Sequence, residues 1–264
     1  MTVADNSRQG RRNAILRELG LSPLWRTRIP KPESAGIPPG ERDKTFVDTG
    51  SAVADLGGPG SPISSTDDMR DDRRSRIMRM PWDELERSVE GCTACSLCKS
   101  RTRTVFGVGD RNADWLCVGE GPGAQEDATG EPFVGQAGKL LDNMLAAISL
   151  KRGLNVYIAN VVKCRPPENR NPTLEEANQC EPYLMRQIEL IKPKLIVALG
   201  KVAAQNLLRT DASVGSLRGK LHWYCGIPVI VTYHPAYLLR TLPAKAKAWE
   251  DLCFAHRTME SPET

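Results

Sequence analysis

In the second part of the chain, apolar residues follow two patterns, one expected for strands and one expected for helices. Short, nearly unbroken apolar runs are typical of buried β-strands, and they lie at 114–119, 155–162, 194–200 and 228–234. Helical patterns fill the intervals and the end of the chain, at 135–150, 173–192, 201–208 and 244–259. A further helix is expected to begin after Pro81, where acidic residues follow at once.

This alternation predicts the fold class. Strands that alternate with helices form a mostly parallel sheet with helices on both faces, so we expect an α/β domain. Thr173 and Glu176 support the pattern, because they form a capping-box signature at the start of one expected helix. In such sheets, ligands bind beside the carboxyl ends of the strands. The residues that follow each strand are therefore the first place to look for chemistry.

The first 80 residues have a different composition. Between Pro30 and Pro62 lie six prolines and six glycines, and such a stretch cannot bury enough apolar surface to offset its chain entropy. We therefore expect residues 1–80 to be a disordered extension and residues 81–264 to be the folded domain. The segment 15–25 carries a short helix-like apolar pattern. It is interpreted either as a frayed helix or as a docking peptide or DNA-contacting arm.

The charge of the chain permits a nucleic-acid partner without requiring one. The 264 residues include 36 Lys and Arg against 32 Asp and Glu, and after residue 80 the counts are 22 against 21. Binding to DNA would therefore need a local basic patch. The sequence has no apolar run of membrane-spanning length and no secretory leader pattern, so we expect a cytoplasmic protein.

The eight cysteines are the strongest compositional signal. In a reducing compartment they are not expected to form a disulfide framework. The C-x2-C-x2-C run at 92–98 and the separate pair Cys164 and Cys180 supply two groups that fit a four-thiolate site, for either zinc or an iron–sulfur cluster. The cysteines interpreted as having no special role are Cys117, Cys225 and Cys253.

Candidate polar residues follow three of the expected strands. The glycine-rich loop 119–138 departs from the G-x-G-x-x-G and Walker patterns, so no nucleotide cofactor is expected there. Asn160 can read the edge of a planar amide such as a nucleobase, or it can bind backbone at the strand end. A lone histidine is more often structural, but His234, with Arg240 nearby in the chain, faces the other polar loops and is a functional candidate.

Taken together, these motifs resemble those of the family 4 uracil-DNA glycosylases, which carry an iron–sulfur cluster. The resemblance runs from Cys92 to Arg240 and rests, in order, on GCTAC, GEGPGAQEDATGEPFVGQAGKLL, NVVKCRPPENRNPT with Cys180, LIVALG, SLRG and TYHPAYLLR. It implies a three-layer α/β/α sandwich around a four-stranded, mostly parallel sheet. It also implies a [4Fe–4S] cluster and leaves Cys98 as a bystander. The implied cluster ligands are Cys92, Cys95, Cys164 and Cys180.

The resemblance further implies that the protein hydrolyses the N-glycosidic bond of uracil in DNA and leaves an abasic site. The target nucleotide must leave the base stack to be reached. Phe133 is then expected to stack on the uracil ring, and Asn160 to hydrogen-bond its polar edge. The other implied substrate-binding residues are Gly119 and Gly121.

Two side chains are implied to assist bond cleavage. Glu120 would orient or deprotonate the attacking water, and His234 would stabilise the departing uracil anion. Glu126 and Asp127 lie in the same loop, so either is an alternative to Glu120 as the residue that positions the water. No lysine occupies an obvious nucleophile position, which predicts a monofunctional glycosylase.

Contacts to DNA are expected beside this site. Arg165 and Arg240 are expected to bind phosphates, with Lys163 and Arg170 as further candidates, and Leu238 is expected to wedge the duplex. The partner is uracil-containing single- or double-stranded DNA, the protein is expected to be a monomer, and the extension is a candidate site for another repair or replication protein. The alternatives that stay open are an iron–sulfur electron carrier and a non-catalytic, metal-stapled DNA-binding module.

Overall fold

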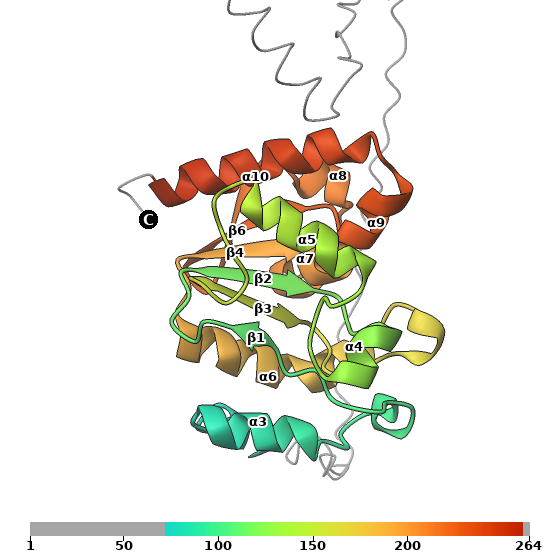
Figure 1. Ribbon diagram of the computed structural model, residues 1–264. Coiled ribbons are helices and arrows are strands. Elements are labelled where there is room, and N and C mark those ends of the chain that lie inside the picture. Colours follow the sequence, from blue (N-terminus) through green and yellow to red (C-terminus); the bar gives the residue numbers. More distant parts are fainter. Residues whose placement is uncertain (1–71, 261–264) are drawn as a thin grey trace, which may run out of the picture. The chain divides into compact units, whose positions relative to one another are not determined.

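The structure of the chain is a computed structural model that describes residues 72–260 (Figure 1). The chain divides into two units, residues 1–60 and 61–264, and the described residues all belong to the second. The prediction of a disordered extension therefore falls mostly outside the described residues. Residues 72–77 are helical, and Ile77 and Met80 are buried in the core, so the packed part includes residues before 81.

A six-stranded sheet with the order β1-β3-β2-β4-β6-β5 forms the centre of this unit. The four central strands are parallel to one another, as predicted, whereas β1 and β5 pair antiparallel at the two edges. The expectation of four strands was therefore wrong by these two short edge strands. The strands are β1 (Val108–Gly109), β2 (Trp115–Gly119), β3 (Val156–Asn160), β4 (Leu195–Leu199), β5 (Leu221–Tyr224) and β6 (Ile227–Thr232).

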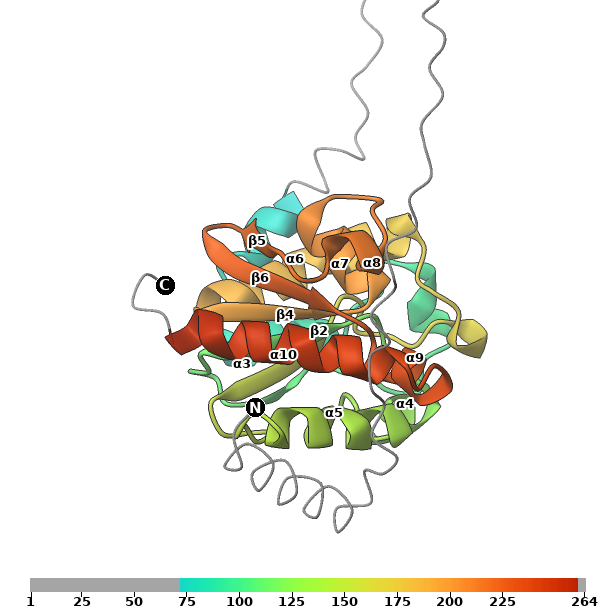
Figure 2. The same ribbon diagram turned by 90° about the horizontal axis from the view of Figure 1, so that it is seen from above.

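Helices cover both faces of the sheet (Figures 1 and 2). On one face, α5 and α10 bury apolar side chains against the sheet, and on the other, α6 and α7 do so, with α3 packed outside α6. This confirms the three-layer arrangement. The helices are α3 (Trp82–Glu90), α4 (Ala124–Thr129), α5 (Gln136–Ala146), α6 (Leu174–Ile191), α7 (Lys201–Leu208), α8 (Val214–Leu217), α9 (Pro235–Arg240) and α10 (Ala244–Glu260), with 3-10 turns η1 (Ser96–Lys99) and η2 (Pro167–Asn169).

Each central strand is buried on both faces, which is why the strands read as unbroken apolar runs. Burial of these side chains between two helical layers is the main source of stability for such a fold, at about 25 cal/mol per Å² of apolar surface. The sheet therefore forms a rigid platform, and the loops that leave its strands are held in fixed positions.

The parallel strands end together at one edge of the sheet. Gly119 at the end of β2 is paired with Asn160 at the end of β3, and Leu199 of β4 with Thr232 of β6. After β3 the chain crosses back over β2 to form β4, so the connections diverge between β2 and β4. A crevice at such a topological switch point is the usual ligand site of an open α/β sheet.

Candidate active site

A cavity of about 750 Å³ lies at this edge of the sheet. Four of its lining residues come from the ends of the four parallel strands, one from each. They are Glu120, Asn160, Gly200 and His234. The three side chains predicted from separate strand ends are therefore brought together in one cavity.

Phe133 and Asn160 form a narrow slot in the cavity wall. Asn160 is only 2 % exposed, and its Oδ1 has no hydrogen-bond partner. A Cβ atom added to Gly119 would lie 2.5 Å from that Oδ1 and 2.6 Å from Cζ of Phe133. An unpaired buried amide oxygen is costly unless a ligand completes it. The slot therefore suits a flat, polar-edged ring that slides beside Phe133.

His234 stands next to Phe133, with its ring centroid 5.5 Å from that of Phe133. Burial, with the charge of Arg240 adding to it, lowers the pKa of His234 to about 4, so the imidazole is neutral at pH 7. The backbone N–H of Ala236 donates to Nδ1 (3.2 Å). Because Nδ1 accepts, the neutral ring carries its proton on Nε2. His234 is thus preset as a neutral hydrogen-bond donor.

A close approach from β4 supports this histidine. Gly200 has a φ of +90°, and a Cβ atom there would lie 2.8 Å from Cβ of His234. Only glycine adopts this backbone conformation readily and leaves room for the imidazole. Gly200, which the sequence assigned only to a helix start, therefore also shapes the site.

Glu120 and Glu126 both line the cavity, but their carboxylates differ in what they bind. Burial raises the pKa of Glu120 above its ordinary value. Glu126 instead accepts hydrogen bonds from the backbone N–H groups of Gly123 (3.1 Å), Val134 (3.0 Å) and Gly135 (3.0 Å). Its carboxylate thus ties the loop before α4 to the loop before α5, which leaves Glu120 as the better candidate for the water-positioning group.

Asp127, the other predicted alternative to Glu120, lies on α4, and its carboxylate is directed away from the cavity. It is buried, and its carboxylate accepts from the backbone N–H groups of Thr102 (2.9 Å) and Arg103 (3.3 Å). It does not line the cavity. Asp127 therefore joins α4 to the segment after the cysteine run and is not a candidate for water activation.

The residues predicted to contact DNA differ in exposure and in whether they line the cavity. Arg240 is exposed and lines the cavity, as a phosphate contact requires. Leu238 is 1 % exposed and packs in the core, so its prediction as the wedge is wrong, because a wedge must reach the base stack. Arg165 is half-buried, its Nε donates to Asn169 Oδ1 (2.7 Å), and it does not line the cavity.

Lys163 cannot contact phosphate, since it is 1 % exposed. Its Nζ donates to the carbonyl of Asn160 (3.0 Å) and to Oε1 of Gln187 (2.6 Å), and burial lowers its pKa to about 8. Its backbone N–H donates to Sγ of Cys180 (3.3 Å). Lys163 therefore connects a predicted cluster ligand to the strand end that carries Asn160.

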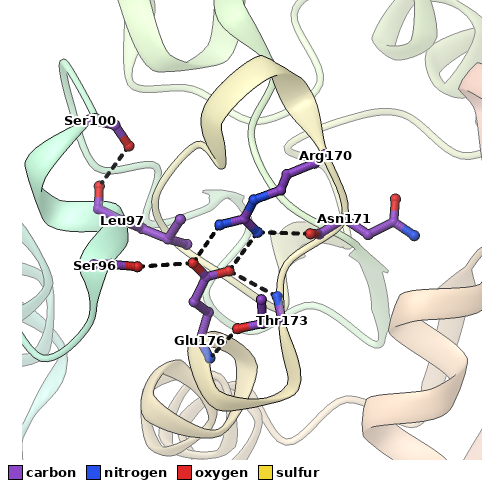
Figure 3. Close-up of polar contacts among 7 residues, drawn as sticks. All are labelled: Ser96, Leu97, Ser100, Arg170, Asn171, Thr173 and Glu176. Carbon is purple, nitrogen blue, oxygen red and sulfur yellow. Dashed lines mark hydrogen bonds and ion pairs between the residues drawn. The ribbon is translucent and has the colours of Figure 1, made fainter.

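Arg170 is engaged in an internal network (Figure 3). Its guanidinium donates to both oxygens of Glu176 (2.7 and 2.8 Å), and Ser96, in the cysteine run, donates to the same carboxylate (3.0 Å). Glu176 also completes the predicted capping box with Thr173. The network connects the cysteine run, the cavity rim and the start of α6. Arg170 therefore has a structural role, in addition to any contact that it makes to DNA.

This network predicts a dependence of stability on acidic pH. Chiefly through the hydrogen bond from Arg170, the pKa of Glu176 is lowered to about 2 from 4.5. A carboxyl with a depressed pKa stabilises the fold above its unfolded pKa and loses that contribution as pH falls toward its folded pKa. Glu176→Gln is therefore expected to be less stable than the wild type at pH 7, with the gap narrowing between about pH 4.5 and 2.

Urea unfolding of the two proteins at pH 7 and pH 3 measures this gap. Glu189→Gln is the control, because Glu189 forms an exposed ion pair with Arg186 at the other end of α6. A gap between wild type and Glu176→Gln of equal size at both pH values would contradict the assignment.

The predicted cluster ligands surround one small cavity. It is lined by Cys92, Cys95, Cys164 and Cys180, and also by Cys98, which the sequence left as a bystander. Burial raises the pKa of three of these thiols, to about 12 for Cys180, so they stay protonated until a metal displaces their protons.

The surroundings of this cavity fit an anionic cluster. Among residues 72–260, no group of three or more His, Cys, Asp or Glu lies close enough together to hold a single metal ion. N–H donors face the sulfurs, as thiolate ligands of an anionic group require. The pairs are Arg101 Nη1 with Cys164 Sγ (3.0 Å), Arg73 Nη2 with Cys92 Sγ (3.7 Å) and Lys163 N with Cys180 Sγ (3.3 Å).

Sequence reasoning missed these sulfur-facing arginines. Arg101 also donates to the carbonyls of Cys92 (2.8 Å) and Glu90 (3.1 Å). These hydrogen bonds hold the start of the cysteine run in place. Arg73 lies in the segment that was assigned to the extension. The contacts of these arginines with sulfur join segments that are apart in the chain, so no sequence motif predicts them. The only signal in the sequence is that both arginines lie near Cys92.

Comparison with known proteins shows the family to which the chain belongs. The family model of the uracil DNA glycosylase superfamily matches residues 106–253, which include all the named residues that line the 750 Å³ cavity, whereas Cys92, Cys95 and Cys98 lie before this range. The chain belongs to this superfamily. Its similarity is strong to proteins named type-4 uracil-DNA glycosylase. Those from Archaeoglobus fulgidus and Thermotoga maritima are 48 % and 49 % identical to it, over 60 % and 58 % of this chain and 82 % and 80 % of their own lengths.

A third relative extends the match. The type-4 uracil-DNA glycosylase of Pyrobaculum aerophilum is 41 % identical over 181 residues, which is 66 % of this chain and 92 % of that protein. The same organism has a type-5 uracil-DNA glycosylase that is 34 % identical over 49 % of this chain. The recognition made from the motifs is therefore confirmed, and it places the chain with the type-4 proteins. No helix within residues 72–260 has the length and hydropathy to cross a membrane.

Proposed function

We propose that this protein removes uracil from DNA by hydrolysing the bond between uracil N1 and the sugar C1′, as the first step of base excision repair. The observation that carries the proposal is the buried, unpaired Oδ1 of Asn160 beside the ring of Phe133 and a neutral His234. The names of the similar proteins support it. The function classes without catalysis need none of these three side chains.

Uracil fits the slot by its hydrogen-bonding edge. Its N3–H can donate to Oδ1 of Asn160, and its O4 can accept from the Asn160 amide N–H. Cytosine has an acceptor at N3 and an amino group in place of O4, so the same amide would be left unmatched in a buried site. Unmatched buried polar groups allow a site to reject an analogue by about 10⁴-fold or more. The ring of Phe133 adds stacking that does not depend on base identity.

Bond cleavage moves an electron pair onto uracil. As the C1′–N1 bond breaks, the sugar becomes cationic, and the leaving uracil becomes an anion with charge on O2. The Nε2–H of the neutral His234 imidazole donates a hydrogen bond to that oxygen. This bond stabilises the anion without transfer of the proton. Water then attacks C1′ and gives its proton to the Glu120 carboxylate, which also stabilises the cationic sugar. The uracil anion then takes up a proton at N1 from solvent, and Glu120 returns its proton to solvent. The products are free uracil and an abasic site, with the strand intact.

The assay for this function uses an oligonucleotide with one uracil and an end label. Incubation with the protein followed by alkali is expected to break the strand at the uracil position, in single- or double-stranded substrate. Without alkali the strand is expected to stay intact, because water is the nucleophile in this mechanism and no Schiff base with the sugar forms to start strand cleavage. Absence of breakage on both substrates would reject the function.

The cysteine cavity is proposed to hold a [4Fe–4S] cluster on Cys92, Cys95, Cys164 and Cys180. When bound, the cluster links the segment before β2 to the segment after β3 and to α6. Base hydrolysis transfers no electrons, so its role here is structural. Through Lys163, this link also fixes the backbone of Asn160.

Cys164→Ala is expected to lower iron content, visible absorption and soluble yield together. Removing one thiolate of a four-thiolate site leaves an open coordination position, and binding of the group is coupled to folding. Cys225→Ala is the matched control, because Cys225 is exposed and lies outside this cavity. Iron content and absorbance of the purified proteins measure the effect, and a Cys164→Ala protein with full iron content would reject this ligand.

DNA is proposed to lie over the cavity rim. Arg240 and Lys201, both exposed at the rim, are the phosphate contacts that the structure favours, while Arg165 stays a prediction. Leu239 and Leu242 are exposed after His234, so they replace Leu238 as candidates for the wedge. A monomer located in the cytoplasm, where thiolate ligands stay reduced, is consistent with this use. A repair or replication partner for the extension stays a prediction.

A further inference from the structure

The backbone of Phe133 is in an unusual conformation. Its φ is 55°, in the left-handed region that bulky residues rarely adopt. Such conformations persist only where the surroundings hold them, and they concentrate at functional sites. Phe133 forms one wall of the uracil slot, so whatever holds its backbone also fixes the wall.

Arg152 makes the contacts that hold this backbone. It lies in the loop between α5 and β3, and its guanidinium donates from Nη1 to the carbonyl of Pro132 (2.8 Å) and from Nη2 to the carbonyl of Phe133 (2.8 Å). Its Nε donates to Oδ1 of Asp142 on α5 (2.9 Å). The rigid fork of a guanidinium thus spans two successive carbonyls while a carboxylate fixes its orientation. Arg152 does not line the cavity.

Gly138, in the first turn of α5, provides space for the carbonyl of Phe133. A Cβ atom added to Gly138 would lie 1.7 Å from the carbonyl oxygen of Phe133, so no side chain is possible there. The carbonyl is therefore enclosed between Gly138 and the guanidinium of Arg152. On its other side, the Phe133 ring packs beside Gly119 and His234. A shift of the Phe133 backbone would move the ring directly into or out of the slot.

We propose that Arg152, oriented by Asp142, is a positioning residue that fixes the Phe133 ring in the uracil slot. The inference rests on the proposed function, because the position of the ring matters to the reaction only if a base enters the slot. Arg152 acts through Phe133 and touches no substrate. Its loss is expected to weaken binding of uracil in the slot while the rest of the site stays intact.

A double-mutant cycle on the holoenzyme tests this dependence. Phe133→Ala is expected to lower kcat/KM for uracil release by about 10²-fold, as loss of base stacking does. Arg152→Ala is expected to lower it by about 10-fold, mostly through a higher KM, and to raise the inhibition constant of free uracil by a similar factor, because stacking acts in ground and transition states alike. Added to Phe133→Ala, it is expected to cost less than about 2-fold.

Two further variants separate positioning from general stability. Arg152→Lys is expected to recover part of the loss, since an ammonium can donate to a carbonyl but lacks the fork. Arg186→Ala is the matched control: its Nε donates to a carbonyl, that of Met80 (2.8 Å), it pairs with Glu189, and its side chain is 19 % exposed against 22 % for Arg152. It lies on α6 away from the cavity and is expected to leave kcat and KM unchanged.

A readout independent of activity uses fluorine NMR. The chain has four phenylalanines, so protein labelled with fluorophenylalanine gives four signals, and Phe133→Ala identifies that of Phe133. Arg152→Ala is expected to shift or broaden this signal and to leave that of Phe254 in place.

An unchanged Phe133 signal, or an equal cost of Arg152→Ala with and without the Phe133 ring, would overturn the inference. Absence of uracil release by the wild type would reject the proposed function instead, while the NMR comparison would still decide whether Arg152 positions Phe133.

Discussion

Glu120→Gln is expected to lower kcat for uracil release by about 10²–10⁴-fold with little change in KM, because a group that acts on the attacking water contributes mainly in the transition state. Burial raises the pKa of the Glu120 carboxyl, and no neighbouring charge among the described residues contributes to that shift. A desolvated carboxylate is a stronger base, which suits it to accept a proton from water. Glutamine keeps the size of the side chain but cannot take the proton.

The pH profile of the wild type sharpens this prediction. Since protonation removes the base, kcat is expected to fall as pH drops through the raised pKa of Glu120, at a pH above the ordinary carboxyl value of 4.5. Glu120→Gln is expected to lack this acid limb. Glu131→Gln, which removes an exposed carboxylate in the next loop, between α4 and α5, is the control and is expected to keep both rate and profile. A Glu120→Gln enzyme with full rate would show that another group positions the water.

Gly119→Ala is expected to abolish most activity by filling the slot. The added Cβ would lie 2.5 Å from Oδ1 of Asn160 and 2.6 Å from Cζ of Phe133, so one of the two walls must move. Because Gly119 and Asn160 are paired strand residues in the centre of the sheet, the backbone cannot give way easily. Misplacement of a reacting group by about 1 Å costs about 10²-fold, and we expect at least that loss in kcat/KM.

A matched glycine separates this steric effect from a general cost of alanine. Gly91 caps α3 with a φ of −82°, and a Cβ atom there would meet only the carbonyl of Arg87 at 3.8 Å. Gly91→Ala is expected to leave the rate of uracil release unchanged. Thermal unfolding of both variants shows whether Gly119→Ala remains folded. A folded Gly119→Ala enzyme with wild-type activity would mean that the base does not enter beside Phe133.

The sequence was sufficient to find the residues at the strand ends. Glu120, Asn160 and His234 lie at or just after the end of an apolar run that is buried on both faces, and parallel topology then brings them to one edge of the sheet. The central strands and the capping box of α6 could be predicted for the same reason, since strong local patterns specify them. The edge strands β1 and β5 could not, because they have two and four residues and a weak apolar pattern.

Contacts between distant segments account for what the sequence could not supply. Leu238 and Leu239 are adjacent and chemically identical, and only the packing of the short helix α9 decides that Leu238 is buried and Leu239 exposed. Lysine is rarely buried fully, so nothing marked Lys163 as a link between Asn160 and α6. Arg152 could not be predicted from the sequence either, because its proposed role depends on a carbonyl that lies 19 residues away in the chain.

The most direct test of the account is to count released uracil against abasic sites in one reaction. The wild-type holoenzyme is incubated with an oligonucleotide that carries a single uracil; free uracil is measured by mass spectrometry and abasic sites by alkali cleavage. We expect one uracil for each alkali-sensitive site, no release of thymine or cytosine from matched oligonucleotides, and loss of both signals in Glu120→Gln. Binding of the uracil oligonucleotide without any free uracil would contradict the account and would favour a DNA-binding module without catalysis.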